Sequence, residues 1–120
     1  DDDKSVFQKY WDFLKQSQLE SAYLGILTPY PGTRIFEKYQ KEGRILHYNW
    51  DRYDTSNVVF RPKKMTEKEL TEGYIWAYKK SYSFFSIFKR LRKTTAYKPF
   101  FWPMNVGFNL SIKRFSKAAQ

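Results

Sequence analysis

The sequence contains one nearly continuous apolar run of strand length, Ala22–Leu27. Apolar side chains on both faces are typical of a strand that is covered on both sides, as in a parallel sheet. The segment Thr28–Thr33 follows it with two prolines and a glycine, which remove backbone donors and permit a turn, so we expect the strand to stop there. Thr33 can cap a helix over 34–42, which Gly43 closes. The order strand, loop and helix predicts one βα unit of a parallel sheet or barrel.

Helical periodicity appears before and after this unit. Apolar residues spaced i, i+3, i+4 and i+7 predict a helix over 5–17, and they are Phe7, Tyr10, Trp11 and Leu14. Thr66 and Glu69 have the spacing of a capping box, which predicts a second helix with its apolar stripe running to Tyr78. The serines at 81–83 are expected to kink or restart that helix, which then continues to about Lys93.

The remaining segments have weaker patterns. Residues 44–62 mix aromatic and polar side chains, and we expect an ordered loop ending in a short strand at Val58–Phe60. Residues 94–120 contain Pro99, Pro103 and Gly107, which predicts an irregular segment.

Composition excludes several kinds of chemistry. The 120 residues contain no cysteine, so disulfides, a thiolate nucleophile and any Cys-ligated zinc or iron-sulfur cluster within them are ruled out. Aromatic residues make up 21% of the chain, enough apolar area for an ordered body. No apolar run approaches the roughly 18 to 20 residues of a membrane span, and Asp1–Lys4 is unlike a secretory signal, so we expect a cytoplasmic protein. Asp1–Lys4 also resembles part of a protease-cleavage tag, and both origins stay open.

Positive charge is concentrated in the second half of the chain. Residues 1–60 hold 8 Lys/Arg against 9 Asp/Glu, whereas residues 61–120 hold 14 against 3, and no acidic residue follows Glu72. Three stretches together combine cations with large rings: Lys89–Lys93 and Lys113–Arg114 supply cations, and Tyr97–Met104 supplies the rings. Such a mixture suits an anionic membrane surface or single-stranded nucleic acid. Packing of the rings on further protein is the expectation ranked first, contact with anionic lipid second and nucleic acid last.

Several segments together resemble a known family. They are Asp2–Phe7, Leu24–Thr33, Glu42–Leu46, Trp50–Asp54, Val58–Lys63 and the pattern from Met65 to Tyr78. In this order and spacing they resemble the end of the barrel and the C-terminal extension of radical S-adenosylmethionine (radical-SAM) Fe-S oxidoreductases, above all those that carry a cobalamin-binding domain. The resemblance covers residues 2 to about 92.

The resemblance implies a fold class and a site. The fold would be α+β and mostly helical, with one βα unit of a partial TIM barrel followed by a short strand and a helical C-terminal extension. Residues 1–43 would be the end of the barrel, 44–93 the extension and 94–120 a basic aromatic tail. In the family, the main chain after the last strand lies against the adenine of S-adenosylmethionine. The implied cofactor-binding residues are therefore Leu27, Thr28, Pro29 and Tyr30.

The resemblance also implies what is missing. The family binds a [4Fe–4S] cluster through Cys-x-x-x-Cys-x-x-Cys, and this chain has no cysteine. In the intact family enzyme the cluster reduces S-adenosylmethionine, which yields a 5′-deoxyadenosyl radical that abstracts hydrogen from substrate. The chain would contribute a wall and a cover of that site, with the rest of the barrel as its partner, and would be inactive alone. The alternative hypothesis is a non-enzymatic basic module that docks on an anionic membrane surface or nucleic acid.

Other polar residues are candidates for catalytic or metal-binding groups. His47 is the only histidine, and without a neighbouring acid or second histidine it is expected to be an ordinary loop residue. Asp51 and Asp54 are expected to accept hydrogen bonds from backbone amides in the turn 53–57 rather than to act in catalysis. Tyr30 could face a substrate, but packing under its loop is the favoured interpretation.

Overall fold

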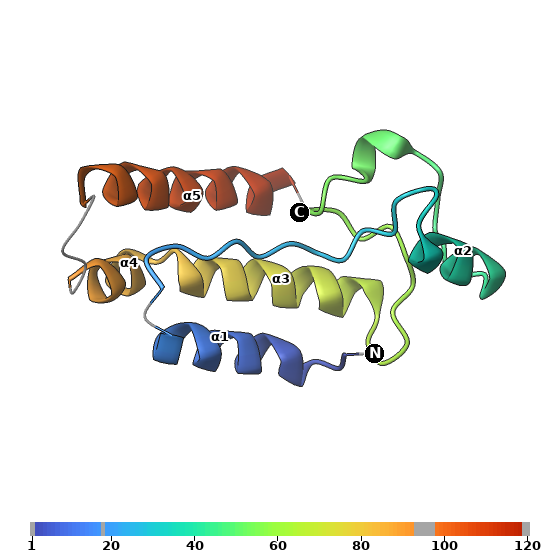
Figure 1. Ribbon diagram of the computed structural model, residues 1–120, viewed down its shortest axis with the longest axis horizontal. Helices are drawn as coiled ribbons and strands as arrows, with labels where there is room; N and C mark the ends of the chain where they lie inside the picture. The colour runs from blue at the N-terminus through green and yellow to red at the C-terminus, as the bar shows by residue number, and fades with distance from the viewer. Residues whose placement is uncertain (1, 18, 93–97, 119–120) are drawn as a thin grey trace. The chain divides into compact units, whose positions relative to one another are not determined.

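The computed structural model describes residues 2–17, 19–92 and 98–118, and this part of the chain is mostly helical (Figure 1), as predicted. The helices are α1 (Ser5–Ser17), α2 (Arg34–Lys41), α3 (Glu67–Ser81), α4 (Phe84–Leu91) and α5 (Lys98–Ala118), with a 3-10 turn, η1, at Trp50–Arg52. The described residues contain no regular strand.

The chain forms two compact units whose boundary falls inside α3. The first unit comprises Leu24–Tyr74 and the described residues before Val6. The second comprises Val6–Tyr23 and the described residues from Ile75 onward. The expected division into a barrel end at 1–43, an extension at 44–93 and a tail at 94–120 is based on resemblance to a family. The boundaries of the compact units do not test it, so it stays a prediction.

The core of the first unit is small and aromatic. Phe36 of α2, Tyr53 and Val59 are buried together, and Ile45 packs against them. Arg44 covers a second pair of rings, Tyr39 and Phe60. Its guanidinium carbon lies 4.0 Å from the centroid of Tyr39. The Arg44 Nε donates to the carbonyl of Arg61 at 2.7 Å. This arginine therefore joins α2 to the segment that precedes α3.

Local capping rules place the ends of α2 as predicted. Thr33 is the N-cap, and its hydroxyl accepts a hydrogen bond from the amide of Phe36 at 3.3 Å. Glu42 caps the other end, and Gly43 follows with φ of 64°, a left-handed conformation that glycine adopts without strain.

The capping box at the start of α3 is also confirmed. The amide of Thr66 donates to Glu69 Oε2 at 2.8 Å, and the amide of Glu69 donates to Thr66 Oγ1 at 3.2 Å. Lys4 lies 2.6 Å from the other oxygen of this carboxylate. The hydrogen bond from Lys4, followed by the one from the Thr66 amide, lowers the pKa of Glu69 from 4.5 to about 2.

We expect the Glu69 carboxyl to titrate near the value of about 2 in the folded chain and near 4.5 when the chain unfolds. Because the folded pKa is the lower one, this group stabilises the fold above pH 4.5, and the contribution is lost as pH falls from 4.5 toward 2. Carbon-13 NMR of the carboxyl should show the Glu69 pKa rising in Lys4→Met. The control is Lys68→Met, which removes a lysine that pairs with Glu72; an unchanged pKa in Lys4→Met would contradict the assignment.

The two predicted strands do not form in the described part of the chain. Residues 22–27 are without regular structure, and in this segment the amide of Ile26 donates to the carbonyl of Thr55 at 2.7 Å. The expected strand at Val58–Phe60 is reduced to an isolated antiparallel bridge between Ile45 and Phe60. A strand needs a continuous ladder with a neighbour, and the described residues supply only these short pairings.

The second unit is centred on Tyr82, whose side chain is completely buried. Its ring stacks with Tyr78 of α3 and Phe108 of α5, with centroid separations of 4.9 and 5.0 Å. Its hydroxyl donates to the carbonyl of Ala22. Helix α4 packs against α5 (Figure 1). Ser83 is the N-cap of α4, so the helix restarts after Ser81 as predicted.

The prediction that residues 94–120 are irregular is wrong for the described part, because Lys98–Ala118 form α5. Pro99 lies in the first turn, where a missing N–H costs no intrahelical bond. Pro103 lies inside the helix and removes one. Tertiary hydrogen bonds accompany this loss: Asn105 Nδ2 donates to Glu20 O at 3.2 Å, and Asn109 Nδ2 donates to Tyr82 O at 2.6 Å.

Candidate functional site

The first candidate site is the loop after residues 22–27, where the resemblance implies a cofactor. Thr28 and Pro29 are buried, whereas Leu27 is 50% exposed and Tyr30 is 44% exposed. Tyr30 therefore does not pack fully under its loop. The loop presents one aliphatic and one aromatic side chain to the surface, which suits contact with a flat heterocycle.

Hydrogen bonds fix this loop from within. Thr28 Oγ1 donates to the carbonyl of Ile26 at 3.1 Å. The carbonyl of Tyr30 accepts from both the amide and the hydroxyl of Thr33, at 3.1 and 2.6 Å. Gly32 has φ of 80°, the positive value that the tight turn into α2 requires. The orientation of Leu27 and Tyr30 is thus set by the main chain on both sides of them.

Two of the other candidate polar residues, His47 and Asp54, have structural partners. Asp51 lies in η1, where its own amide donates to Asn49 Oδ1 at 3.2 Å. His47 Nδ1 accepts from the amide of Asn49 at 3.3 Å, and the His47 carbonyl accepts from the hydroxyl of Tyr53 at 2.7 Å. Burial raises the pKa of Asp54, but bonds from the amides of Ser56 and Asn57 outweigh it and lower that pKa below its ordinary value. Among the described residues, no group of three or more acidic or histidine side chains could hold a metal ion.

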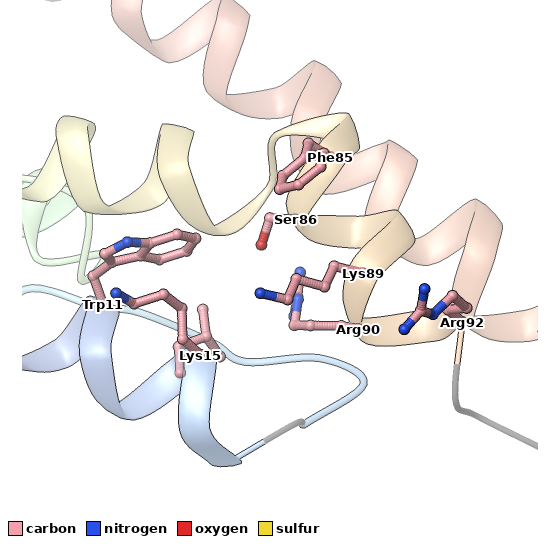
Figure 2. Close-up of a pocket in the computed structure, with 8 residues that line it drawn as sticks. Trp11, Lys15, Phe85, Ser86, Lys89, Arg90 and Arg92 are labelled. Carbon is pink, nitrogen blue, oxygen red and sulfur yellow. The ribbon is translucent and has the colours of Figure 1, made fainter.

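A second candidate site lies in the second unit, where a pocket with a volume of about 220 Å³ opens between α1 and α4. Figure 2 shows the Trp11 ring extending from α1 toward the α4 side chains Phe85, Ser86 and Lys89, and the amino end of Lys15 lying beside Trp11. The lining residues are Trp11, Leu14, Lys15, Phe85, Ser86, Lys89, Arg90 and Arg92. They include four cations and no acid. We call this the α1–α4 pocket.

Arg90 contributes a buried positive charge to this pocket. Its Nη2 donates to Ser81 O at 2.7 Å and to Asn105 Oδ1 at 3.2 Å, and Nη1 lies 3.5 Å from the carbonyls of Leu19 and Glu20. All of these acceptors are neutral. Burial lowers the pKa of Arg90, and its Nε–H has no hydrogen-bond partner. Arg90 is thus an internal group, whereas the sequence pattern placed it in a solvated basic stretch.

The sequence interpretation missed the pocket because its walls come from distant positions. The sequence pattern places Trp11 on an apolar helical face and Lys89–Lys93 in a basic run. The spacing of Phe84, Ile87, Phe88 and Leu91 predicts one apolar helical face, but only Ile87 and Leu91 of these four are buried. Phe84, Phe85 and Phe88 are exposed, at 59%, 79% and 55%.

The expected contact of the basic aromatic tail with anionic lipid stays a prediction. The exposed phenylalanines of α4, together with Lys89 on this helix and Arg92 at its C-terminal cap, would serve such a contact. Lys93, Tyr97 and the side chains of Lys98, Lys113 and Arg114 lie outside the described residues. Within the described ranges, no helix has both the length and the hydropathy needed to cross a membrane.

Comparison with known families shows which of them this chain is related to. Residues 33–105, which are more than half of the chain, match the family described as "Domain of unknown function (DUF4070)". The chain belongs to the DUF4070 family. The DUF4070 match includes α2, η1, α3 and α4 and ends within α5. It therefore contains the α4 side of the α1–α4 pocket, while Trp11 and Lys15 precede it.

The DUF4070 chain is also similar to curated methyltransferases. Bacteriochlorophyllide d C-12(1)-methyltransferase of Chlorobaculum tepidum is 35% identical over 117 residues, which are 98% of this chain and 24% of that protein. Bacteriochlorophyllide d C-8(2)-methyltransferase of the same organism is 28% identical over 89 residues, or 72% of this chain and 18% of that protein. An uncharacterized methyltransferase of Pyrococcus horikoshii is 33% identical over 60 residues, or 50% and 13%. No solved structure matches significantly.

The DUF4070 chain thus spans about a quarter of the first of these relatives. Because that alignment covers 98% of the chain, it includes both the Leu27–Tyr30 loop and the α1–α4 pocket. Both candidate sites therefore lie in sequence that this chain has in common with a methyltransferase.

Proposed function

We propose that this chain is the C-terminal part of a radical-SAM methyltransferase, in which it supplies one wall of the S-adenosylmethionine site and a cover over the substrate. The observation that carries the proposal is the alignment of 117 residues with a methyltransferase about four times as long. "Methyltransferase" is the word that the names of all three relatives share, and methyl transfer is accordingly the reaction class that we assign.

The local geometry is compatible with a last barrel strand. Residues 22–27 have no strand neighbour in the described part of the chain, and they lead through a proline-containing turn into a capped helix. An apolar segment of this kind would gain a backbone ladder by pairing with a strand elsewhere in the longer protein. On this proposal the partial TIM barrel is completed by that protein, and the fold of residues 22–43 becomes a βα unit.

Of the two groups that the radical-SAM family binds, the [4Fe–4S] cluster and S-adenosylmethionine, the residues of this chain fit only S-adenosylmethionine. No cysteine is present to ligate a [4Fe–4S] cluster, so the cluster would be held elsewhere in the longer protein. The exposed Leu27 and Tyr30 offer the apolar surface that an adenine ring would contact. The cluster and S-adenosylmethionine would supply the radical chemistry when bound. The residues of this chain would orient the adenine and exclude water from it, and a cobalamin domain, if present, would lie outside them.

The decisive experiment reads the coding sequence upstream of Asp1 and purifies the longer protein anaerobically with iron and sulfide. We expect a Cys-x-x-x-Cys-x-x-Cys segment and reductive cleavage of S-adenosylmethionine. Leu27→Asp should weaken S-adenosylmethionine binding at least about tenfold, because desolvating an unpaired carboxylate against the adenine costs more than about 1.4 kcal/mol. The matched control is Leu110→Asp, at another exposed leucine. An upstream sequence without the three cysteines would refute the proposal.

A further inference from the structure

The α1–α4 pocket is large enough for a small ligand and too small for a large one. Its volume is about 220 Å³. An apolar cavity of about 150 Å³ already accepts benzene, and sites for drug-sized ligands start at about 300 Å³. The volume therefore corresponds to a ligand with one or two fused rings.

The walls of the pocket favour a flat apolar body. Trp11 and Phe85 contribute aromatic rings from opposite helices, and Leu14, which is 1% exposed, forms part of the apolar lining. Phe85 is 79% exposed, so a ligand in the pocket would remove much of this ring from water. Aromatic rings in offset or edge-to-face contact attract each other beyond the gain from burial alone.

The charges around the pocket favour an anion. Lys15 is paired with Asp12 at 2.7 Å and lies 5.7 Å from the centroid of Trp11. Lys89 and Arg92 are exposed and have no ion-pair partner in the part of the chain that the structure describes. Both are therefore available to an anionic group at the mouth of the pocket.

Arg90 gives an independent reason to expect an anion. The residue is 7% exposed, its acceptors are all neutral, and its Nε–H is unpartnered. A buried charge without a counterion is costly, and a negative group nearby lowers that cost. The bonds to Ser81 and Asn105 hold this charge in place beside the pocket, so the positive potential there is a fixed property of the fold.

We propose that the α1–α4 pocket binds a small planar aromatic carboxylate, with the rings between Trp11 and Phe85 and the carboxylate toward Lys89 and Arg92. This site is separate from the Leu27–Tyr30 wall and does not depend on the function proposed above. The chemical class follows from the pairing of two aromatic walls with an excess of cations.

The probe for the test is naphthalene-2-carboxylate, and its uncharged match is naphthalene-2-carboxamide. In a titration of the nitrogen-15-labelled chain at low salt, we expect saturable shifts in the amides of α1 and α4. The carboxylate should bind about tenfold more tightly than the carboxamide, as expected if two exposed cations each contribute about 0.7 kcal/mol. Equal affinities, no binding of either probe, or shifts confined to other segments would overturn the proposal.

Variants separate the charge from the shape of the pocket. Lys89→Gln combined with Arg92→Gln should remove most of the preference for the carboxylate and leave carboxamide binding within about twofold, because exposed substitutions seldom alter the fold. Lys79→Gln is the matched control, since Lys79 is exposed on α3 and does not line the pocket. Ser86→Leu should block both probes by filling the pocket. An undiminished preference after the double substitution would refute the role of these cations.

Discussion

Tyr82→Ala is expected to lower the free energy of unfolding by about 4 kcal/mol, the range seen when a fully buried aromatic ring is removed from a core. Tyr82 is 0% exposed, and its ring packs between Tyr78 and Phe108. Alanine would leave a cavity where residues from α3 and α5 meet. Urea denaturation followed by circular dichroism measures the change as a shift in the unfolding midpoint.

Two further variants show how much of this loss in unfolding free energy comes from the Tyr82 hydroxyl and how far it depends on the burial of the ring. Tyr82→Phe keeps the ring and removes the hydroxyl that donates to Ala22 O, so we expect a loss of only about 1–1.5 kcal/mol. Phe85→Ala removes a ring that is 79% exposed and should change stability by less than about 0.5 kcal/mol. If Tyr82→Ala were as mild as Phe85→Ala, the placement of Tyr82 at the centre of the second unit would be wrong.

Arg90→Ala should lower the free energy of unfolding by about 3 kcal/mol. The substitution leaves the carbonyl of Ser81 and the amide oxygen of Asn105 without their donor, and a buried acceptor left unpaired costs about 1–3 kcal/mol. The measurement is again urea denaturation. Arg92→Ala, at the exposed arginine two positions on, is the control and should stay within about 0.5 kcal/mol.

Arg90→Met distinguishes the guanidinium from its aliphatic stem. Methionine fills much of the same volume but donates no hydrogen bond, so we expect it to be less stable than the parent chain and more stable than Arg90→Ala. A buried charge can also be replaced by an apolar residue without loss when its desolvation cost is high. If Arg90→Met were as stable as the parent chain, the cost of desolvating the guanidinium would equal the contribution of its bonds to Ser81 and Asn105.

Features set by neighbouring residues could be predicted from the sequence. The α1 helix follows from its apolar spacing, and the start of α3 follows from the Thr66–Glu69 pair. The caps at Thr33 and Ser83 are equally local. Each depends on residues within one or two helical turns, which is the range over which propensity and capping act.

Features set by distant residues could not be predicted. A strand at 22–27 requires a neighbour that the local pattern does not contain, and α5 forms despite Pro103 while Asn105 and Asn109 bond to residues far back in the sequence. The α1–α4 pocket joins Trp11 to Phe85. The Leu27–Tyr30 site follows from the resemblance, and the structure adds which of its side chains are exposed and which hydrogen bonds hold the loop.

The hydrogen bonds of Tyr82 and Asn105 have a consequence for the order of folding. They join residues 60 and 85 positions apart, to Ala22 and Glu20 respectively. During synthesis, residues 6–23 leave the ribosome long before α5 exists, and ribosomes add about 5–20 residues per second. The core of the first unit, which contains Phe36 and Val59, can form before residues 6–23 make their hydrogen bonds to Tyr82 and Asn105. The N-terminal residues of this chain would therefore be among the last to reach their final positions, and until then Trp11 and Leu14 would be open to chaperones.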